Sequence, residues 1–273
     1  MITSRQNPLI QRARRASSAA SKDTLFIEGL RLCEEAARSP SRLVCEEVLY
    51  TEKFAADARA ARLLDALARL KPLFSLVSEP VLASLGDTKT PQGVVLLARR
   101  FETDRAAFEQ TSLADKQTSL ADPLLVVLHG INNPANAGAM LRVAEAAGAT
   151  GVVATAGTTD LLSPKALRGA MGSSFRLPLW TGADFAEVVS WCRERGIRTV
   201  SADLGAAQTH TEIAWAGARA VLMGAEAGGL NKAEVRAADE RLRIPMQPPV
   251  ESLNVAVALA VILYEAARQR GRA

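Results

Sequence analysis

Short apolar runs alternate with helix-like segments along the chain, and this alternation predicts an α/β fold. In the second half, strands are predicted at residues 124–128, 151–155, 197–202, 219–223 and 242–245. Helices are predicted at residues 136–147, 184–195, 231–238 and 252–269. A run such as Leu124–Leu128 has no alternating polar residue, which is typical of a parallel sheet covered on both faces. We therefore expect a parallel-sheet domain over residues 124–273.

The first hundred residues show the same alternation on a smaller scale. Strands are expected at 24–27, 44–50 and 93–98, and helices at 7–16, 29–38 and 54–70. Residues 1–100 are thus expected to form a small α/β domain. Residues 101–123 are expected to be a linker, because Gln110–Asp115 and Gln117–Asp122 form a direct repeat too short to stack into a core.

Three strand-to-helix segments in the second half share one build: a strand, a turn of small residues, one or two isolated polar groups, and a helix. They are Asn132–Arg142, Met223–Asn231 and Ile244–Val255. In open α/β sheets, ligands bind beyond the carboxyl ends of the strands, where glycine allows close approach of the backbone. The three segments therefore predict one composite site.

The last of these segments contains two polar residues beside a strongly apolar helix. Ser252 is the predicted N-cap of that helix. Asn254 follows it, next to the apolar run Val255–Tyr264. A buried amide is costly unless its hydrogen bonds are made, so Asn254 is expected either to be satisfied locally or to face a ligand.

Composition excludes several kinds of site. The glycine pattern of a dinucleotide-binding turn does not occur after the run 124–128. Aromatic residues make up 4% of the chain, which disfavours a surface of stacked bases. The three cysteines share no metal-binding spacing and there are two histidines, so we expect no metal site and no disulfide framework. With no signal peptide and no membrane-length apolar helix expected, we predict a cytoplasmic protein.

Positive charge is concentrated at the amino-terminal end. The net charge is +4, and residues 1–22 carry no acidic side chain. They contain Arg5, Arg12, Arg14 and Arg15, for which we expect contact with RNA phosphates. The arginines of residues 268–273 are expected to be a solvated helix end.

The three composite-site segments resemble, in the same order, the motifs of the SpoU (TrmH-like) family of RNA ribose 2′-O-methyltransferases, within the SPOUT superfamily. The similar stretches are Asn133–Arg142, Gly224–Leu230, and Ile244–Met246 with Glu251–Val255. Ile2–Leu9, Phe26–Arg31 and Asp87–Gly93 look like the substrate-binding domain that precedes many members. Alanine stands at 170, 227 and 256 where the family often has serine, glycine and serine, which leaves the substrate open.

The resemblance implies a cofactor, S-adenosylmethionine, held by backbone groups at Gly224, Ile244 and Leu253 with Met246 beside them. It implies that Arg142 faces the RNA, where a guanidinium can grip a phosphate and stabilise an alkoxide more readily than it can act as a base. Asn136, Glu226, Ser252 and Asn254 would position the substrate or this arginine. Asn136 could instead cap its helix, and Arg168 with Lys165 could contact phosphate or solvent.

The resemblance also implies a fold and partners. These are a carboxy-terminal trefoil knot, an amino-terminal domain like a small ribosomal protein that binds bent RNA, and a homodimer formed through the carboxy-terminal domain. Ribosomal RNA is the expected substrate. The open alternatives are the same chemistry on transfer RNA, a resistance enzyme acting on the ribosome, a catalytically silent RNA-binding protein, and a small-molecule methyltransferase.

Overall fold

The computed structural model describes residues 1–86, 90–114, 122–226 and 228–271. Parts of the predicted repeat and of Asp87–Gly93, together with Ala227 and Arg272, lie outside these ranges. Contacts divide the chain into two units. The first comprises Met1–Phe101 and Leu162–Arg176, and the second Glu102–Leu161 and Leu177–Ala273.

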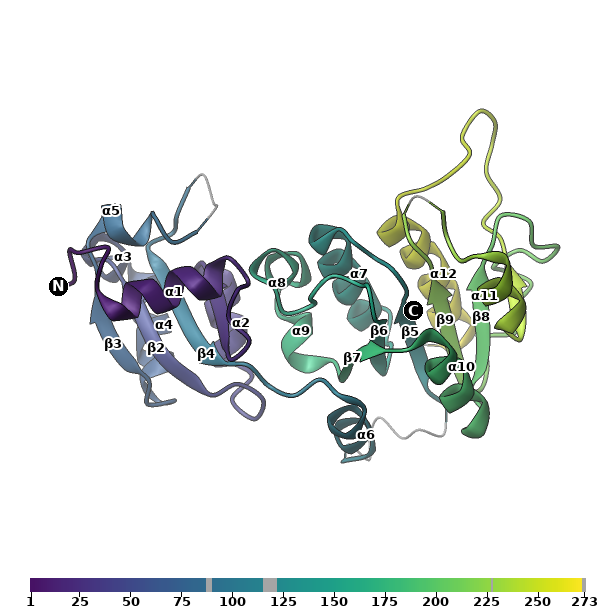
Figure 1. The fold of residues 1–273 in the computed structure, drawn as a ribbon, viewed down its shortest axis with the longest axis horizontal. Coiled ribbons are helices and arrows are strands. Elements are labelled where there is room, and N and C mark those ends of the chain that lie inside the picture. Colours follow the sequence, from purple (N-terminus) through teal and green to yellow (C-terminus); the bar gives the residue numbers. More distant parts are fainter. Residues whose placement is uncertain (87–89, 115–121, 227, 272–273) are drawn as a thin grey trace. The chain divides into compact units, whose positions relative to one another are not determined.

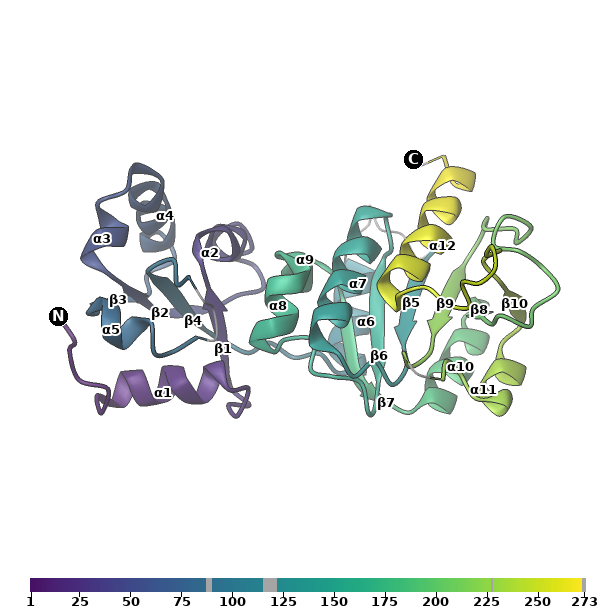
Figure 2. The same ribbon diagram turned by 90° about the horizontal axis from the view of Figure 1, so that it is seen from above.

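The first unit is built on a four-stranded sheet in the order β1 (Thr24–Glu28), β4 (Val94–Arg99), β2 (Cys45–Tyr50), β3 (Leu73–Leu76). β4 runs antiparallel to β1 and β2, and β2 pairs with β3 in parallel. Helices α2 (Leu30–Ala37) and α4 (Ala58–Ala68) cover one face, and α1 (Pro8–Ser17) lies on the other (Figure 2). The residues of α1 and α5 (Glu79–Leu82) that are buried against this sheet share one apolar core.

The helix predicted at 54–70 is two helices, α3 (Glu52–Ala55) and α4. Asp57 separates them, because its carboxylate accepts hydrogen bonds from the N–H groups of Arg59 and Ala60 and so begins a new helix. Strand β3 and helix α5 were not predicted from the sequence. β3 is an edge strand with an exposed Leu73, so it lacks the continuous apolar run of a buried strand.

Residues 162–176 fold with the first unit although they lie far along the sequence. They form α8 (Pro164–Ala170) and α9 (Ser173–Arg176), neither of which was predicted. α8 packs against β1, and Arg168 Nη1 lies 3.4 Å from the carboxylate of the buried Glu28.

Over its described residues, the second unit has a sheet of six strands in which every pair is parallel, which confirms the predicted parallel-sheet domain. The order is β10 (Glu240–Leu242), β8 (Arg198–Ala202), β9 (Arg219–Met223), β5 (Leu124–Leu128), β6 (Gly151–Thr155), β7 (Leu179–Ala183). α7 (Pro134–Ala146) and α12 (Val255–Gln269) cover one face, while α10 (Phe185–Glu194) and α11 (Lys232–Ala237) cover the other (Figure 2). The strand order reverses between β5 and β9, where a crevice for ligands is expected at the carboxyl edge.

Part of the segment predicted to be a linker is helical and packed. α6 (Arg105–Ala114) buries Phe108 against Trp180 and Trp191. Glu109 accepts a hydrogen bond of 2.6 Å from Trp191 Nε1. Phe108 is a large apolar side chain in a helix of mostly small and polar residues, so the apolar periodicity that identifies a helix is weak here.

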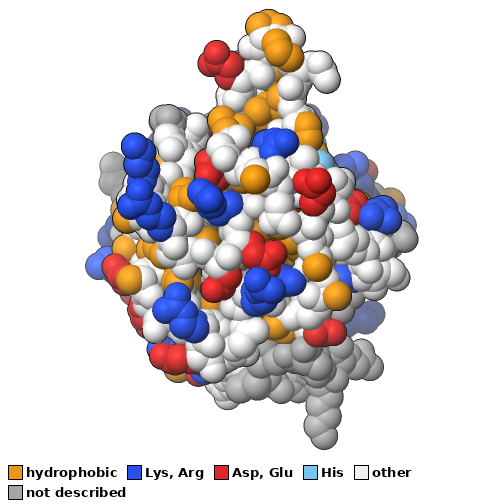
Figure 3. Space-filling view, turned by 90° about the vertical axis from the view of Figure 1, so that its right-hand side faces the viewer, with side chains coloured by type: hydrophobic (Ala, Val, Ile, Leu, Met, Phe, Trp, Pro, Cys, Tyr) orange, Lys and Arg blue, Asp and Glu red, His pale blue; other side chains and the backbone are white. Residues whose placement is uncertain are grey.

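The loop between β10 and α12 projects from the second unit (Figure 1). It carries hydrophobic side chains toward its tip (Figure 3), and Val250 is 53% exposed. Basic and acidic side chains are interspersed over the face seen in Figure 3. Within the described ranges, no helix is both long and apolar enough to cross a membrane.

Candidate active site

A cavity of about 550 Å³ lies at the carboxyl edge of the second unit's sheet. The last residues of three neighbouring strands line it: Ala202 of β8, Met223 of β9 and Leu242 of β10. Parallel strands end at the same edge, so the loops that follow them meet there. The second and third predicted segments both line this cavity, and the first contributes Asn136, as the composite-site prediction requires.

The loop after β9, residues Gly224–Leu230, is folded tightly on itself. The N–H of Gly229 donates to the carbonyl of Ala225 at 2.8 Å, and Gly229 has a φ of +63°. A Cβ on Gly224 would lie 2.2 Å from the carbonyl carbon of Gly229, which is closer than any side chain can approach backbone. Gly224 therefore permits a loop whose backbone lines the cavity.

The third segment forms the opposite wall with Ile244, Met246, Ser252, Leu253 and Asn254. Strand β10 ends at Leu242, so Ile244 follows the strand rather than ending it as predicted. The prediction that Ser252 caps the last helix is wrong. The cap is Asn254, whose Oδ1 accepts hydrogen bonds from Ala256 N at 2.9 Å and Val257 N at 3.4 Å.

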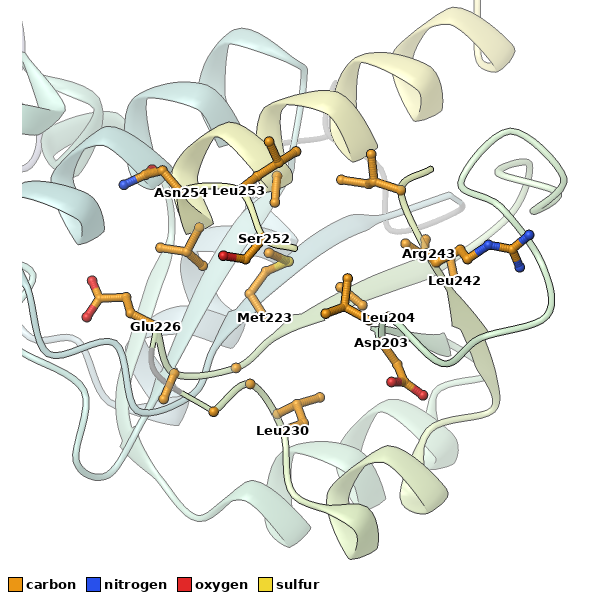
Figure 4. Close-up of a pocket in the computed structure, with 18 of the residues that line it drawn as sticks. Asp203, Leu204, Met223, Glu226, Leu230, Leu242, Arg243, Ser252, Leu253 and Asn254 are labelled. Atoms are coloured by element: carbon orange, nitrogen blue, oxygen red, sulfur yellow. The ribbon is translucent and has the colours of Figure 1, made fainter. Parts of the chain in front are cut away.

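Three polar side chains from the three segments form one hydrogen-bonded chain. Asn254 Nδ2 donates to Asn136 Oδ1 at 3.2 Å, and Asn136 Nδ2 donates to Glu226 Oε1 at 2.6 Å. The cap fixes the orientation of the Asn254 amide, since Oδ1 must accept from the helix and Nδ2 must then face Asn136. Glu226 and Asn254 lie at the same end of the cavity in Figure 4.

Asn136 does not cap its helix, which was one of its predicted roles. Asn133 is the cap of α7, with Oδ1 accepting from Ala135 N at 2.9 Å and Pro134 in the first turn. The side chain of Asn136 is therefore available to join the second and third segments.

Arg142 is exposed on α7 and is not among the residues that line the cavity. Six residues along an α-helix correspond to a rotation of about 240° from Asn136. The two side chains consequently point to different sides of α7, so this chain alone does not bring Arg142 into the cavity.

The arginines predicted to bind RNA all belong to the first unit. Arg5 and Arg15 are exposed, and Arg14 is half-buried. Arg12 is paired with Glu46 and also donates to Thr24 Oγ1. Arg168 is paired with Glu28, as described above. Arg12 and Arg168 therefore already hold acidic partners within the protein.

The sequence did not identify the contribution of the loop after β8. Asp203 and Leu204 line the cavity at the end opposite Glu226 and Asn254 (Figure 4). Leu230 and Val235 add apolar surface. The sequence does predict β8, and a strand that lies parallel to β9 must end at the same edge of the sheet, so the loop after β8 could have been expected near the site. The segment Asp203–Ala207 has no distinctive motif that would indicate a site. In the described part of the chain, no group of three or more histidine, cysteine, aspartate or glutamate residues could hold a metal ion.

Two family models match the chain. Residues 123–264 match the SpoU rRNA methylase family, and residues 26–103 match a model described as RNA 2′-O ribose methyltransferase substrate binding. Among curated proteins, the 23S rRNA (guanosine-2′-O-)-methyltransferase RlmB of a Burkholderia species is 36% identical over 214 residues. The alignment covers 78% of this chain and 85% of that protein.

Solved structures are similar over nearly the whole chain. A crystal structure of an RNA 2′-O ribose methyltransferase is 33% identical, with a TM-score of 0.80 and 98% of each chain covered. The SpoU methyltransferase AviRb from Streptomyces viridochromogenes, in complex with AdoMet, is 25% identical with a TM-score of 0.83. That comparison covers 97% of this chain and 98% of AviRb.

Proposed function

The chain belongs to the SpoU family of S-adenosylmethionine-dependent RNA 2′-O-ribose methyltransferases, and we propose that it methylates a ribose 2′-hydroxyl of ribosomal RNA. The RlmB relative, named for its action on 23S rRNA, supports this substrate. The match of residues 26–103 to the family's substrate-binding model supports an RNA substrate. A ribosomal substrate implies a cytoplasmic protein.

The observation that carries the proposal is the cavity in which the three motif segments meet. Its volume falls within the range of about 300–1,000 Å³ typical of small-molecule sites. Leucine, isoleucine, valine and methionine side chains suit an adenine ring. We propose that backbone donors and acceptors of Gly224, Ile244 and Leu253, all of which line the cavity, hold the cofactor. Met246 adds to the apolar wall. These features fit S-adenosylmethionine.

The bound cofactor supplies an electrophilic methyl group. The chain's own task is to hold the ribose hydroxyl in line with it and to stabilise negative charge on the ribose oxygen. We propose that Asn136, Glu226 and Asn254 act as one positioning unit at the RNA end of the cavity, because their hydrogen bonds fix one another's orientation. Ser252, exposed beside Asn254, is proposed to contact the substrate.

Arg142 is proposed to contact the target phosphate and stabilise the alkoxide as it forms. Its exposure on α7 is consistent with contact to a bound macromolecule. A guanidinium presents a planar fork of donors suited to phosphate.

Titration calorimetry with S-adenosylmethionine tests the cofactor site. We expect binding by the wild-type chain and none by Leu253→Arg, since Leu253 lines the cavity. Ala61→Arg is the matched control, because it adds the same charge at an exposed position of α4.

A transfer assay with labelled cofactor, offering ribosomal RNA and transfer RNA separately, tests the substrate. Label in a ribose of ribosomal RNA supports the proposal, and label in transfer RNA alone contradicts it. Cofactor binding without transfer to either RNA would favour a catalytically silent RNA-binding protein.

We further propose a homodimer formed through α12. Val257, 50% exposed, and Tyr264, 51% exposed, lie on the outer side of this helix, and Leu253 precedes it. An apolar stripe of this kind is typical of a protein interface. Sedimentation should report a dimer for the wild type and a monomer for the double variant Val257→Glu, Tyr264→Glu. A wild-type monomer would contradict the proposal.

The division into a substrate-binding domain over 1–100 and a catalytic domain over 124–273 is also proposed. The family matches over 26–103 and 123–264 support it. The trefoil knot is proposed on family membership. The return of the chain from β10, at one edge of the sheet, to α12 packed on α7 is compatible with it.

A further inference from the structure

His129 contacts residues on both sides of the loop Gly224–Leu230, here called the glycine loop, and is not among the residues that line the cavity. It directly follows β5, and its backbone N–H donates to the carbonyl of Met223 at 2.8 Å, where the loop begins. Its Nε2 lies 3.2 Å from Glu234 Oε1 on α11, the helix that the loop enters. A single residue therefore bridges the entry and exit of the loop.

Glu234 connects His129 to residues that line the cavity. Its second carboxylate oxygen accepts the N–H of Asn231 at 2.8 Å, and Asn231 Oδ1 accepts the N–H of Glu234 at 3.0 Å. This reciprocal pair is a capping box that fixes the start of α11. Leu230 immediately before it and Val235 immediately after Glu234 both line the cavity.

The imidazole ring is held on its other sides. Nδ1 lies 2.8 Å from Thr155 Oγ1 at the end of β6. The ring packs edge to face against Phe185 at the start of α10, with centroids 4.7 Å apart. The side chain is 23% exposed, so it is a partly buried group with partners on both nitrogens. Its orientation toward Glu234 is thereby set by the ends of two neighbouring elements.

The next residue lies near the start of the loop. Gly130 has a φ of +66°, and a Cβ there would lie 3.5 Å from the Cβ of Ala225. His129 thus contacts the residue before the loop and the helix after it, and Gly130 lies near the loop's first turn.

We propose that His129, through Glu234, is a positioning residue for the cofactor site and holds the glycine loop in its binding conformation. This inference rests on the cofactor assignment made above. His129 sets the separation between Met223 and Asn231, and hence the position of the backbone that faces the cofactor.

Two substitutions separate the two nitrogens. In His129→Gln the side-chain amide reaches the position of Nε2 and retains the contact with Glu234. In His129→Asn the amide reaches only the position of Nδ1, so the contact with Thr155 remains and that with Glu234 is lost. We expect the Kd for S-adenosylmethionine to rise about tenfold or more in His129→Asn. A change of this size corresponds to the free energy of a hydrogen bond to a charged group. His129→Gln should stay within about threefold of the wild type, and kcat at saturating cofactor should change little in either.

Hydrogen exchange in the absence of cofactor provides a readout independent of activity. The amides of Gly229 and Leu230 should exchange faster in His129→Asn than in the wild type or in His129→Gln. Glu109→Ala is the control, because it removes the charged hydrogen bonds that hold α6 in the same unit without touching the loop. It should leave both the Kd and the exchange at these amides unchanged.

The possible failures are distinguishable. A wild-type chain that binds S-adenosylmethionine while His129→Asn binds it equally well overturns the positioning role and leaves the proposed function intact. An equal loss of affinity in Glu109→Ala also overturns it, since the effect would then be general destabilisation. A wild type that binds no cofactor contradicts the proposed function, whereas unchanged exchange at Gly229 and Leu230 contradicts the loop contact by itself.

Discussion

Gly224 occupies a position where the fold leaves no room for a side chain. Backbone atoms of Gly229 and Leu230 occupy the space where its Cβ would be, at 2.2 and 2.3 Å. Backbone cannot move away as the end of a flexible side chain can, so Gly224→Ala must open the loop. We expect this variant to stay folded and lose detectable binding of S-adenosylmethionine by calorimetry.

Gly205→Ala is the matched comparison for Gly224→Ala. Its added Cβ would meet Asp203 at an ordinary 3.6 Å, and Gly205 is in the segment that follows the cavity-lining Leu204. We expect near-normal cofactor affinity. Normal affinity in Gly224→Ala as well would show that the loop conformation does not determine binding.

Arg142 is expected to affect turnover and not cofactor affinity, because it lies outside the cavity lining. Arg142→Ala should bind S-adenosylmethionine with an unchanged Kd and lose methyl transfer by a factor of at least about 100, the scale of one transition-state hydrogen-bond donor. Arg142→Lys keeps the charge without the planar fork and should recover only part of the rate. A Kd that rises together with the loss of rate would place Arg142 in the cofactor site instead.

Individual site residues were predictable where a motif was present. The sequence predicted Gly224, Glu226, Leu253 and Asn254 as site residues, and all of them line the cavity, while their roles stay predictions. It did not identify the cap of the last helix, because serine and asparagine are equally good caps and only the backbone conformation decides between them. The sequence does not indicate a role for His129, since its side-chain contacts come from elements distant in sequence.

At the scale of elements, the carboxy-terminal turn of α12 is fastened to the segment before β9. Gln269 accepts from Trp215 N at 3.1 Å and donates to the carbonyl of Ile213 at 3.1 Å. Glu265 accepts from Gln269 at 2.7 Å and from Arg268 at 2.8 Å. The hydrogen bonds from Arg268 and Gln269 lower the pKa of Glu265 from 4.5 to about 2.

This lowered pKa predicts an acid dependence of stability. A carboxylate whose pKa is lower in the folded state stabilises the fold above its unfolded value of 4.5, and the contribution is lost as the pH falls toward 2. We expect the free energy of unfolding of Glu265→Gln to fall less steeply than that of the wild type between pH 4.5 and 2. Urea unfolding at several pH values measures it.

Glu194→Gln is the control for this pH dependence, because Glu194 is an exposed glutamate in α10. Its variant should follow the wild-type pH dependence. Parallel curves for Glu265→Gln and the wild type would contradict a role for the Glu265 hydrogen bonds in acid stability.

The bounds of buried central strands were easier to predict from the sequence than those of edge strands and of helices held by distant contacts. β5, β6 and β9 have the predicted bounds because central parallel strands are continuous apolar runs. β7, at an edge, was missed because Thr181 and Gly182 interrupt its apolar pattern. α6 was not predicted because Phe108 and Glu109 stabilise it through contacts with Trp180, Trp191 and Arg195, which are distant in sequence.

At the scale of the whole molecule, the chain passes between its two units more than once. Residues 162–176 leave the second unit and fold with the first. No local sequence pattern predicts that residues 162–176 fold with the first unit. Their placement depends on the packing of α8 against β1 and on the pairing of Arg168 with Glu28. The sequence left open whether Arg168 contacts phosphate or solvent, and it does not reveal this acidic partner.

The distribution of charge over the two units leads to a prediction about RNA affinity. The face of the second unit in Figure 3 mixes basic and acidic groups, whereas Arg14 and Arg15 follow one another in the last turn of α1. Each phosphate contact contributes about 0.7–0.9 to the slope of log K against log salt concentration. The double variant Arg14→Ala, Arg15→Ala should therefore bind ribosomal RNA more weakly and reduce that slope by about 1–2, with cofactor affinity unchanged.

Arg12→Ala provides the comparison within the same helix. Arg12 is already paired with Glu46, so its removal releases no phosphate contact and should change the slope by much less. Glu46 keeps Arg99 within 3.4 Å, which limits the structural effect of the substitution. Filter binding at several salt concentrations separates the cases. Equal slopes for the wild type and the double variant would mean that the charge of α1 is solvated and that RNA is held elsewhere, whereas a large effect of Arg12→Ala would mean that its ion pair opens when RNA binds.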